Sequence, residues 1–290
     1  MKTLIHIGTH KTATTFLQHN YFPAIKGVNY FHGEIFFANL LRSGCSLDDN
    51  LFISNEGLSG IAWNPLWKDG IRNDFHWIGS FEKNISILYK LLPHAHLLFV
   101  FRKHGDLLLS MYKQYVQEGG VLKFNDFFSE TGVIRKEDLN YTYRIKKVCS
   151  LFNKVYVLSY EDYKKFGNDF LDSFIQKELN LSRNELSIDK TKYNKSVSGS
   201  KLELLRKINK VYKKLPFRWS NLLNCLGWGP ERILRQKLAF WSPKDSAEFR
   251  KIRDEINIEM QNDWNYVEAV KWQYNPLKDD NSIKSPLAIS

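Results

Sequence analysis

The sequence has few cysteines and no long apolar run, which excludes several classes of protein. Its three cysteines (Cys45, Cys149 and Cys225) are odd in number and lack the paired spacing of a metal site, so we expect reduced thiols. No apolar segment approaches the roughly 20 residues of a membrane-spanning helix. Polar residues begin at His6 and Thr9, so the apolar core of a secretory signal is missing. We therefore expect a soluble, cytoplasmic protein.

Internal repeats and low-complexity blocks are also missing, and the composition is that of a folded chain. Hydrophobic residues make up 43% of the 290 residues and aromatic residues 14%, which is enough to form a core. This length suits one large α/β domain with insertions, or two small domains. We predict a single domain over residues 1–275 and a C-terminal tail over residues 276–290.

Positive charge is concentrated in one segment. The chain carries a net charge of +11, and residues 190–240 alone contain 13 Lys and Arg against 2 Asp and Glu. The rest of the chain is balanced, with 29 residues of each sign. Such a local excess indicates a surface for an anionic partner, although a solvated helical face would have the same composition.

Short apolar runs alternate with helical patterns along the chain. The runs predict strands at residues 4–7, 51–54, 96–101 and 155–159. Helices are predicted to begin at Phe16 and to span residues 80–92, 106–117, 124–129, 139–152, 169–179, 201–215 and 246–262. This alternation favours a three-layer α/β sandwich with a central, mostly parallel sheet. In such sheets ligands bind at the carboxyl ends of the strands.

The first predicted strand leads into a stretch suited to an anion. Gly8 closes the strand, Lys11 follows, and several threonines (Thr12, Thr14 and Thr15) precede the helix. The first turn of a helix presents unpaired N–H groups and the positive end of its dipole. Lys11 adds a full charge and the threonines add hydroxyl donors. The alternative is an ordinary capped helix with a solvated lysine.

Two further charged residues follow predicted strands. Glu56 comes after the strand at 51–54, and Arg102 comes directly after the strand at 96–101. Because the carboxyl ends of parallel strands share one edge of a sheet, we expect Lys11, Glu56 and Arg102 to lie close together.

The first motif is not the nucleotide-triphosphate loop, which carries a second glycine directly before its lysine. It resembles the 5′-phosphosulfate loop of sulfotransferases, G-x-x-K-T-G-T-T. Gly8, Lys11, Thr12, Thr14 and Thr15 match that pattern, and Ala13 replaces its second glycine. The resemblance implies a P-loop-like strand–loop–helix that holds the 5′-phosphosulfate.

A second motif resembles the 3′-phosphate motif of the same family. Arg102 ends a strand and Ser110 follows eight residues later, with Tyr112 two residues beyond, as in that family. His104 stands where a proline is common. A guanidinium fork binds phosphate oxygens in pairs, which suits Arg102 to this contact. An arginine in an ordinary surface ion pair is the simpler alternative.

Together these motifs resemble the PAPS-dependent sulfotransferases over roughly residues 4–200, most closely those of bacterial and carbohydrate type. Two later stretches are similar as well. Glu161 and Asp162 follow the strand at 155–159, where such residues cap and orient. The stretch at 194–198 resembles a loop that closes over the nucleotide, and implies donor contacts from Lys195, Ser196 and Ser198.

The resemblance implies 3′-phosphoadenosine 5′-phosphosulfate (PAPS) as sulfuryl donor, 3′,5′-adenosine bisphosphate (PAP) as product, and no metal. Lys11 would neutralise the leaving oxygen, and the loop N–H groups and hydroxyls would hold the 5′-phosphate. The acceptor must lose a proton, for which Glu56 is the first candidate and His10 the second. Lesser candidates are His32, His76 and His104.

A carbohydrate or glycoconjugate is the predicted acceptor, because Trp63, Trp67 and Trp77 follow Glu56 closely and could stack on sugar rings; core positions are the simpler reading. The basic segment 190–240 could guide an acidic glycan, a saccharide at an anionic membrane, or the donor. A P-loop kinase using ATP and Mg²⁺, a nucleic-acid-binding protein and a non-catalytic nucleotide-binding relative remain alternatives.

Overall fold

The computed structural model describes residues 3–33, 50–60, 62, 77–184, 199–215 and 247–273. Within them the chain forms a five-stranded sheet in the order β2–β3–β1–β4–β5, and every neighbouring pair is parallel. The strands are β1 (Thr3–Gly8), β2 (Asn29–His32), β3 (Leu51–Ser54), β4 (His96–Phe101) and β5 (Val155–Ser159). The predicted α/β class and parallel sheet are confirmed.

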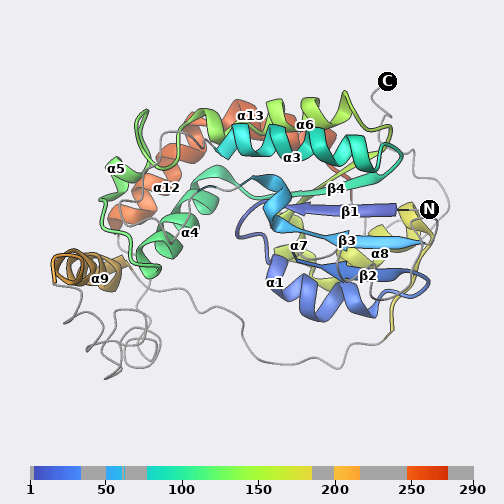
Figure 1. Ribbon diagram of the computed structural model, residues 1–290, viewed down its shortest axis with the longest axis horizontal. Helices are drawn as coiled ribbons and strands as arrows, with labels where there is room; N and C mark the ends of the chain where they lie inside the picture. The colour runs from blue at the N-terminus through green and yellow to red at the C-terminus, as the bar shows by residue number, and fades with distance from the viewer. Residues whose placement is uncertain are drawn as a thin grey trace.

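Helical segments connect and cover these strands (Figure 1). After β1 come α1 (Thr14–Phe16), the π-helical turn η1 (Leu17–Tyr21) and the 3₁₀ turn η2 (Phe22–Ala24). The later elements are η3 (Glu56–Ser59), α3 (Trp77–Leu91), α4 (His104–Gln117), α5 (Phe124–Phe127), η4 (Glu137–Leu139), α6 (Tyr141–Cys149), α7 (Tyr160–Phe166), α8 (Asn168–Leu179), α9 (Gly199–Tyr212), α12 (Ala247–Glu259) and α13 (Gln261–Val270).

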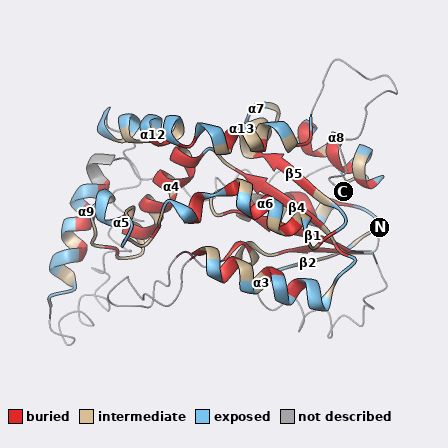
Figure 2. Ribbon diagram, turned by 90° about the horizontal axis from the view of Figure 1, so that it is seen from above, coloured by how far each residue is buried: buried red, intermediate tan, exposed pale blue. Residues whose placement is uncertain are grey.

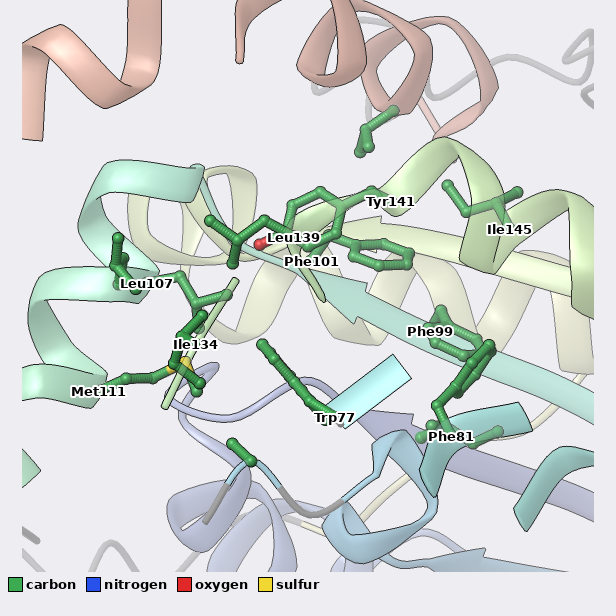
Figure 3. Packing of buried hydrophobic residues seen from close by; sticks show 14 of the residues in the cluster. Trp77, Phe81, Phe99, Phe101, Leu107, Met111, Ile134, Leu139, Tyr141 and Ile145 are labelled. Carbon is green, nitrogen blue, oxygen red and sulfur yellow. The ribbon is translucent and has the colours of Figure 1, made fainter. Parts of the chain in front are cut away.

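Alternation along the strands divides the core into two clusters, one on each face of the sheet. On β4, Leu97 and Phe99 belong to one cluster, whereas Leu98 and Val100 belong to the other. The first cluster packs under α3, α6 and α13 (Figure 3), and the second under η1 and α8. Both faces of the sheet are therefore covered, and Figure 2 shows the strands buried between the helices. This is the predicted three-layer arrangement.

The edge strand β2 was not predicted from the sequence. Its four residues have exposed ends at Asn29 and His32, so no continuous apolar run marks it. The predicted helix over 246–262 is in fact two helices, because the chain breaks at Met260 before α13 starts. Neither β2 nor the break at Met260 has a clear local pattern in the sequence, because both depend on tertiary packing.

Several helices lie together at one end of the molecule. Figures 1 and 2 both show α4, α5, α9 and α12 gathered at the end opposite the N-terminus. Because α4 starts directly after β4, this group lies on the side of the carboxyl ends of the strands. None of the described helices combines the length and apolarity needed to cross a bilayer. Cys149 is a free thiol.

Several predictions concern residues outside the described ranges. These are Trp63, Trp67, His76, Lys195, Ser196 and Ser198, the tail over 276–290, and the basic segment 190–240 except for its residues 199–215.

Candidate functional site

The loop between β1 and α1 turns through two left-handed residues. Lys11 has φ 65° and Ala13 has φ 60°. A side chain costs roughly 1–2 kcal/mol in this conformation, which glycine adopts freely. Ala13 thus adopts the left-handed conformation that glycine favours, at the position where the motif described above has its second glycine. The loop keeps its shape in spite of that substitution.

Glycine is required at the start of the loop. A Cβ built on Gly8 would lie 2.6 Å from Thr14 Oγ1 and 3.0 Å from the ring of His6. Such a contact is far inside van der Waals distance, so any side chain at residue 8 would displace Thr14 and the first turn of α1. The close approach of β1 to α1 therefore depends on Gly8.

Hydroxyl groups fix the loop from inside. Thr12 Oγ1 donates to the carbonyl of Thr9 (2.8 Å) and lies 3.3 Å from Thr14 Oγ1, while Thr9 Oγ1 donates to the carbonyl of Val100 (2.9 Å). Thr12 and Thr14 are buried, whereas Thr15 is partly exposed. The sequence suggested Thr12 as a hydroxyl donor to an anion, but in the structure its proton is used within the loop.

Backbone N–H groups at the start of α1 are left for a ligand. The first intrahelical bond runs from Leu17 N–H to the carbonyl of Ala13 (3.0 Å). The N–H groups of the preceding turn have no intrahelical acceptor and point along the positive end of the helix dipole. The loop can therefore supply several N–H donors to one anion.

Lys11 and Arg102 meet at this loop. Arg102 Nη1 donates to the carbonyl of Lys11 (2.9 Å), and the guanidinium lies over the ring of Tyr160, 4.9 Å from its centroid. Arg102 Nε is buried and has no hydrogen-bond partner among the described residues. A buried, unused donor is costly unless a ligand accepts from it.

The neighbouring charges affect the Lys11 ammonium. Burial lowers the pKa of Lys11, and the charge of Arg102 lowers it further, against the opposing effect of Glu56 and Glu118. Lys11 and Arg102 thus repel each other at the ends of β1 and β4, and Glu56 and Glu118 act against that repulsion. An anion that binds between them would relieve this repulsion.

Glu56 and His10 form a hydrogen-bonded pair beside the loop. Glu56 begins η3, where Asn55 Oδ1 accepts from the N–H of Gly57 (2.9 Å) and caps the turn. Glu56 Oε1 lies 3.1 Å from His10 Nδ1, and His10 Nε2 lies 3.2 Å from the carbonyl of Gly60. The sequence prediction that Lys11, Glu56 and Arg102 converge on one edge of the sheet is thus confirmed.

The charge state of the pair follows from its partners. Burial alone would raise the pKa of the Glu56 carboxyl, but the hydrogen bond from His10 and the charges of His10 and Lys11 outweigh it, so the pKa is lowered. Glu56 is therefore ionised at neutral pH. Each ring nitrogen of His10 then faces an oxygen that can only accept, Glu56 Oε1 on one side and the Gly60 carbonyl on the other.

The end of β5 completes this edge of the sheet. Glu161 Oε1 accepts from the N–H of Lys103 (3.1 Å), and Asp162 pairs with Lys271 (2.7 Å). Burial raises the pKa of Glu161, against the hydrogen bond from Lys103 and the charge of Arg102. Both carboxylates thus orient neighbouring segments, as the sequence indicated.

The remaining candidate residues lie on α4, β2 and α3. Ser110 is partly exposed on α4, two turns after Arg102, whereas Tyr112 is buried and donates to the carbonyl of Leu122 (3.1 Å). His104 is buried and bonded to Asp263 (2.9 Å). His32 lies at the exposed end of β2. Trp77 is 1% exposed in the first core cluster (Figure 3), so it is a core residue and cannot stack on a sugar.

Sequence reasoning missed two residues at the site. Tyr160 supplies the ring beneath Arg102, and Gly60 supplies the carbonyl that meets His10. Tyr160 directly follows a predicted strand, which is a signal that could have identified it. Gly60 lies six residues after its strand, and nothing local connects it to His10.

Comparison with known proteins gives a likeness of structure only. No family model matches the chain, and a search of the curated proteins found no match. Among solved structures, a sulfotransferase from Alicyclobacillus acidocaldarius is similar with a TM-score of 0.46 and 12% identity, over 85% of this chain and 98% of that one. A mouse sulfotransferase complexed with PAP is similar with a TM-score of 0.43 and 13% identity, over 87% and 88%. Likenesses this distant assign neither activity nor ligand.

Proposed function

We propose that this chain is a sulfotransferase that moves a sulfuryl group from PAPS to a hydroxyl or amine of an acceptor. The observation that carries the proposal is the meeting of Arg102 and Lys11, through the 2.9 Å hydrogen bond from the guanidinium to the Lys11 carbonyl. This bond brings the Arg102 guanidinium to the loop that carries Lys11 and the N–H groups before α1, an arrangement that suits a ligand with phosphate groups at two positions.

The residues present fit such a donor. The loop that Gly8 opens would hold the 5′-phosphate through its N–H groups and Thr15, with Thr12 and Thr14 fixing its shape. Arg102, with its unused Nε, would bind the 3′-phosphate together with Ser110. No three described His, Cys, Asp or Glu side chains cluster as metal ligands. Lys11 would neutralise charge on the leaving phosphate oxygen.

Transfer proceeds with acid–base help from Glu56. The acceptor oxygen or nitrogen attacks sulfur, the bond from sulfur to the 5′-phosphate oxygen breaks, and PAP leaves with that electron pair. The acceptor proton passes to Glu56, which is ionised and 32% exposed. His10 is the weaker candidate for the base, because its two ring nitrogens face acceptors and it orients the carboxylate.

The acceptor is proposed to be a saccharide or glycoconjugate, and an anionic one is favoured by α9. Lys207 and Lys210 on this helix and Lys214 in the turn after it are exposed. They lie at the end of the molecule where the carboxyl ends of the strands lie, because α9 is at that end (Figure 2). Its acidic residue Glu203 is already paired with Arg206 (2.6 Å). The outward face therefore attracts anions, from an acidic glycan or an anionic membrane that presents the acceptor.

Calorimetric titration with PAP tests the donor site. The unmodified protein is expected to bind PAP, whereas Lys11→Ala and Arg102→Ala are each expected to weaken binding by at least about tenfold, the loss of one charged hydrogen bond. Lys90→Ala, which removes an exposed lysine from α3, serves as the control and should bind normally. Normal affinity in Arg102→Ala would remove that residue from the site.

An activity assay separates the proposal from its nearest alternatives. Sulfuryl transfer from PAPS, without transfer from ATP and Mg²⁺, is expected. Phosphate transfer from ATP without any use of PAPS would instead identify a kinase. PAP binding without turnover over a broad acceptor panel would identify a non-catalytic relative.

A further inference from the structure

Arg144 on α6 is a fully buried arginine whose contacts are unusual. It is 0% exposed, and its guanidinium contacts two aromatic rings, 4.5 Å from the centroid of Trp77 and 4.7 Å from that of Phe81. Burial lowers the pKa of Arg144 to about 10, so the group stays charged at neutral pH. The positively charged side chain of Arg144 therefore lies inside the first core cluster.

The hydrogen bonds of this guanidinium go to backbone carbonyls. Nη1 donates to Ser59 (2.8 Å), and Nη2 and Nε donate to Asp138 (3.0 and 3.4 Å). The carboxylate of Asp138 is occupied by the N–H groups of Ile78 and Arg135 (both 2.9 Å). Burying a charge with mainly neutral partners costs several kcal/mol, which an apolar side chain in the same volume would avoid.

The Ser59 carbonyl belongs to the turn that carries Glu56. Ser59 Oγ donates to the carbonyl of Glu56 (2.8 Å), and the next residue, Gly60, presents its carbonyl to His10. Gly60 has φ 98°, and a Cβ there would lie 2.5 Å from the Trp77 carbonyl. The turn is therefore pressed against the start of α3 and anchored from α6 by one hydrogen bond.

A second contact joins Arg144 to the pair through Trp77. The Trp77 ring lies 4.5 Å from the guanidinium carbon of Arg144 and 5.6 Å from the ring of His10. Trp77 is buried in the first core cluster (Figure 3), so it cannot shift without disturbing the core. Arg144 thus contacts both the turn that holds Glu56 and the ring against which His10 rests.

We propose that Arg144 is a positioning residue for the Glu56–His10 pair. This proposal rests on the proposed function, in which the Glu56–His10 pair receives the proton of the acceptor. Arg144 fixes the Ser59–Gly60 peptide, and that peptide with Trp77 fixes His10, which in turn orients the carboxylate of Glu56. Losing this anchor would move the base relative to the acceptor, while the hydroxyl bonds of Thr9 and Thr12 that fix the donor loop would remain.

The test compares Arg144→Lys and Arg144→Met with Arg183→Met. Arg183 pairs with Asp172 on the other side of the sheet and is 18% exposed, so its loss costs stability without touching the turn. Per mole of folded enzyme, Arg144→Met is expected to lower kcat by at least about tenfold while PAP affinity stays within about threefold. Arg144→Lys, which keeps one donor, should recover part of kcat, and Arg183→Met should keep it.

Hydrogen exchange is a second measurement, which tests the role of Arg144 even if Arg144→Met folds poorly or the unmodified enzyme is inactive. Hydrogen exchange in Arg144→Lys is expected to rise at residues 56–60 and to stay unchanged at residues 12–17, whereas Arg183→Met should leave 56–60 unchanged. Unchanged kcat in Arg144→Met, or exchange that rises equally in both segments, would overturn the positioning role. Absence of sulfuryl transfer in the unmodified enzyme would overturn the proposed function and leave the exchange result to decide on Arg144.

Discussion

At the scale of single residues, the site depends on how buried charges are paired. Glu56 is ionised because His10 and Lys11 outweigh the effect of its burial. The pKa of Lys11 is lowered because its ammonium group is buried and lies near the positive charge of Arg102. Glu56 is thus held as the carboxylate that would accept a proton in the proposed sulfuryl transfer, whereas an arriving phosphate would stabilise the charge of Lys11.

Replacing the proposed base tests its role directly. Glu56→Gln should leave PAP affinity unchanged and lower turnover by about 10²-fold or more, because the amide cannot accept the acceptor proton. Turnover and calorimetric affinity measured on the same preparation check this expectation. Lys90→Ala, which removes an exposed lysine of α3, is the comparison and should keep both turnover and affinity. Unchanged turnover in Glu56→Gln would remove it from this role.

The pH profile distinguishes Glu56 from a neutral histidine as base. Because the pKa of Glu56 is lowered from its ordinary value by His10 and Lys11, the carboxyl stays ionised between pH 7 and pH 5, and kcat/KM should stay level over that range. A neutral imidazole would instead lose activity below about pH 6.5. On the alkaline side, activity should begin to fall below the ordinary pKa of lysine, because the pKa of Lys11 is lowered and its charge is lost earlier.

A second histidine, His6, makes stability depend on pH. It is fully buried on β1, bonded through Nδ1 to Ser54 (2.8 Å), and burial lowers its pKa to about 4. In the unfolded chain His6 takes up a proton near pH 6.5, whereas in the folded chain it stays neutral until the pH approaches 4. The contribution of His6 to the free energy of unfolding is therefore fully present above pH 6.5 and is lost as pH falls toward 4.

Urea unfolding of the unmodified protein and of His6→Asn measures this effect. Between pH 7 and pH 5 the unmodified protein should lose about 2 kcal/mol more than the variant, from the difference between the folded and unfolded pKa of one group. Equal pH dependence in the two proteins would show that His6 is not the source.

At the scale of elements, the β1–α1 loop combines a required close approach with local strain. Gly8 has no room for a Cβ, because Thr14 Oγ1 occupies that position. Lys11 and Ala13 both adopt left-handed conformations that glycine adopts without cost. Hydrogen bonds from Thr9 and Thr12 keep the loop in this shape. The loop is therefore preorganised by its own contacts, which is what an anion-binding loop needs.

The strain at Ala13 can be measured. Ala13→Gly should stabilise the protein by about 0.5–1 kcal/mol, since relief of the left-handed strain exceeds the added entropy of the unfolded chain. Ala24→Gly, in η2, serves as the control and should destabilise by a similar amount, because no strain is relieved there. Denaturant midpoints report both effects. A loss of stability in Ala13→Gly would show that the left-handed conformation of residue 13 carries no such cost.

At the scale of the whole molecule, charge and shape are arranged around one edge of the sheet. The excess of basic residues falls in 190–240, and its described part, α9, is held against α4 by Asn209, whose Nδ2 donates to the carbonyls of Val116 (2.7 Å) and Gly120 (2.9 Å). Its outer side carries lysines beside Leu204, which is 51% exposed, and Val211, which is 64% exposed. This face is suited to attract an anionic acceptor.

Reversing the charge on α9 tests that idea. The triple change of Lys207, Lys210 and Lys214 to Glu should raise KM for an acidic oligosaccharide acceptor several-fold and leave PAP affinity unchanged, because the change is electrostatic and remote from the loop. The difference should shrink in about 0.5 M salt, which screens exposed charges. Lys83 and Lys90 changed to Glu on α3 provide the control and should have no such effect. An unaltered KM would exclude α9 from acceptor binding.

The sequence alone determined which residues stand at the ends of the strands. Apolar runs at 51–54, 96–101 and 155–159 are local signals of buried parallel strands, and Lys11, Glu56 and Arg102 follow strands in the chain. Parallel pairing then requires these residues to share one edge, so their convergence could be predicted. The loop shape could also be anticipated, since a glycine and threonines at fixed spacing are local features.

Only the tertiary structure decided which contacts these residues make. Three of these contacts could not be predicted from the order of residues. The Thr12 hydroxyl donates a hydrogen bond to the carbonyl of Thr9, His10 lies between Glu56 and Gly60, and Arg144 anchors the turn from α6. The burial that changes the pKa values of Lys11 and His6 likewise comes from packing across the sheet. Such contacts carry no local pattern, because their energy depends on distance and solvent exclusion in three dimensions.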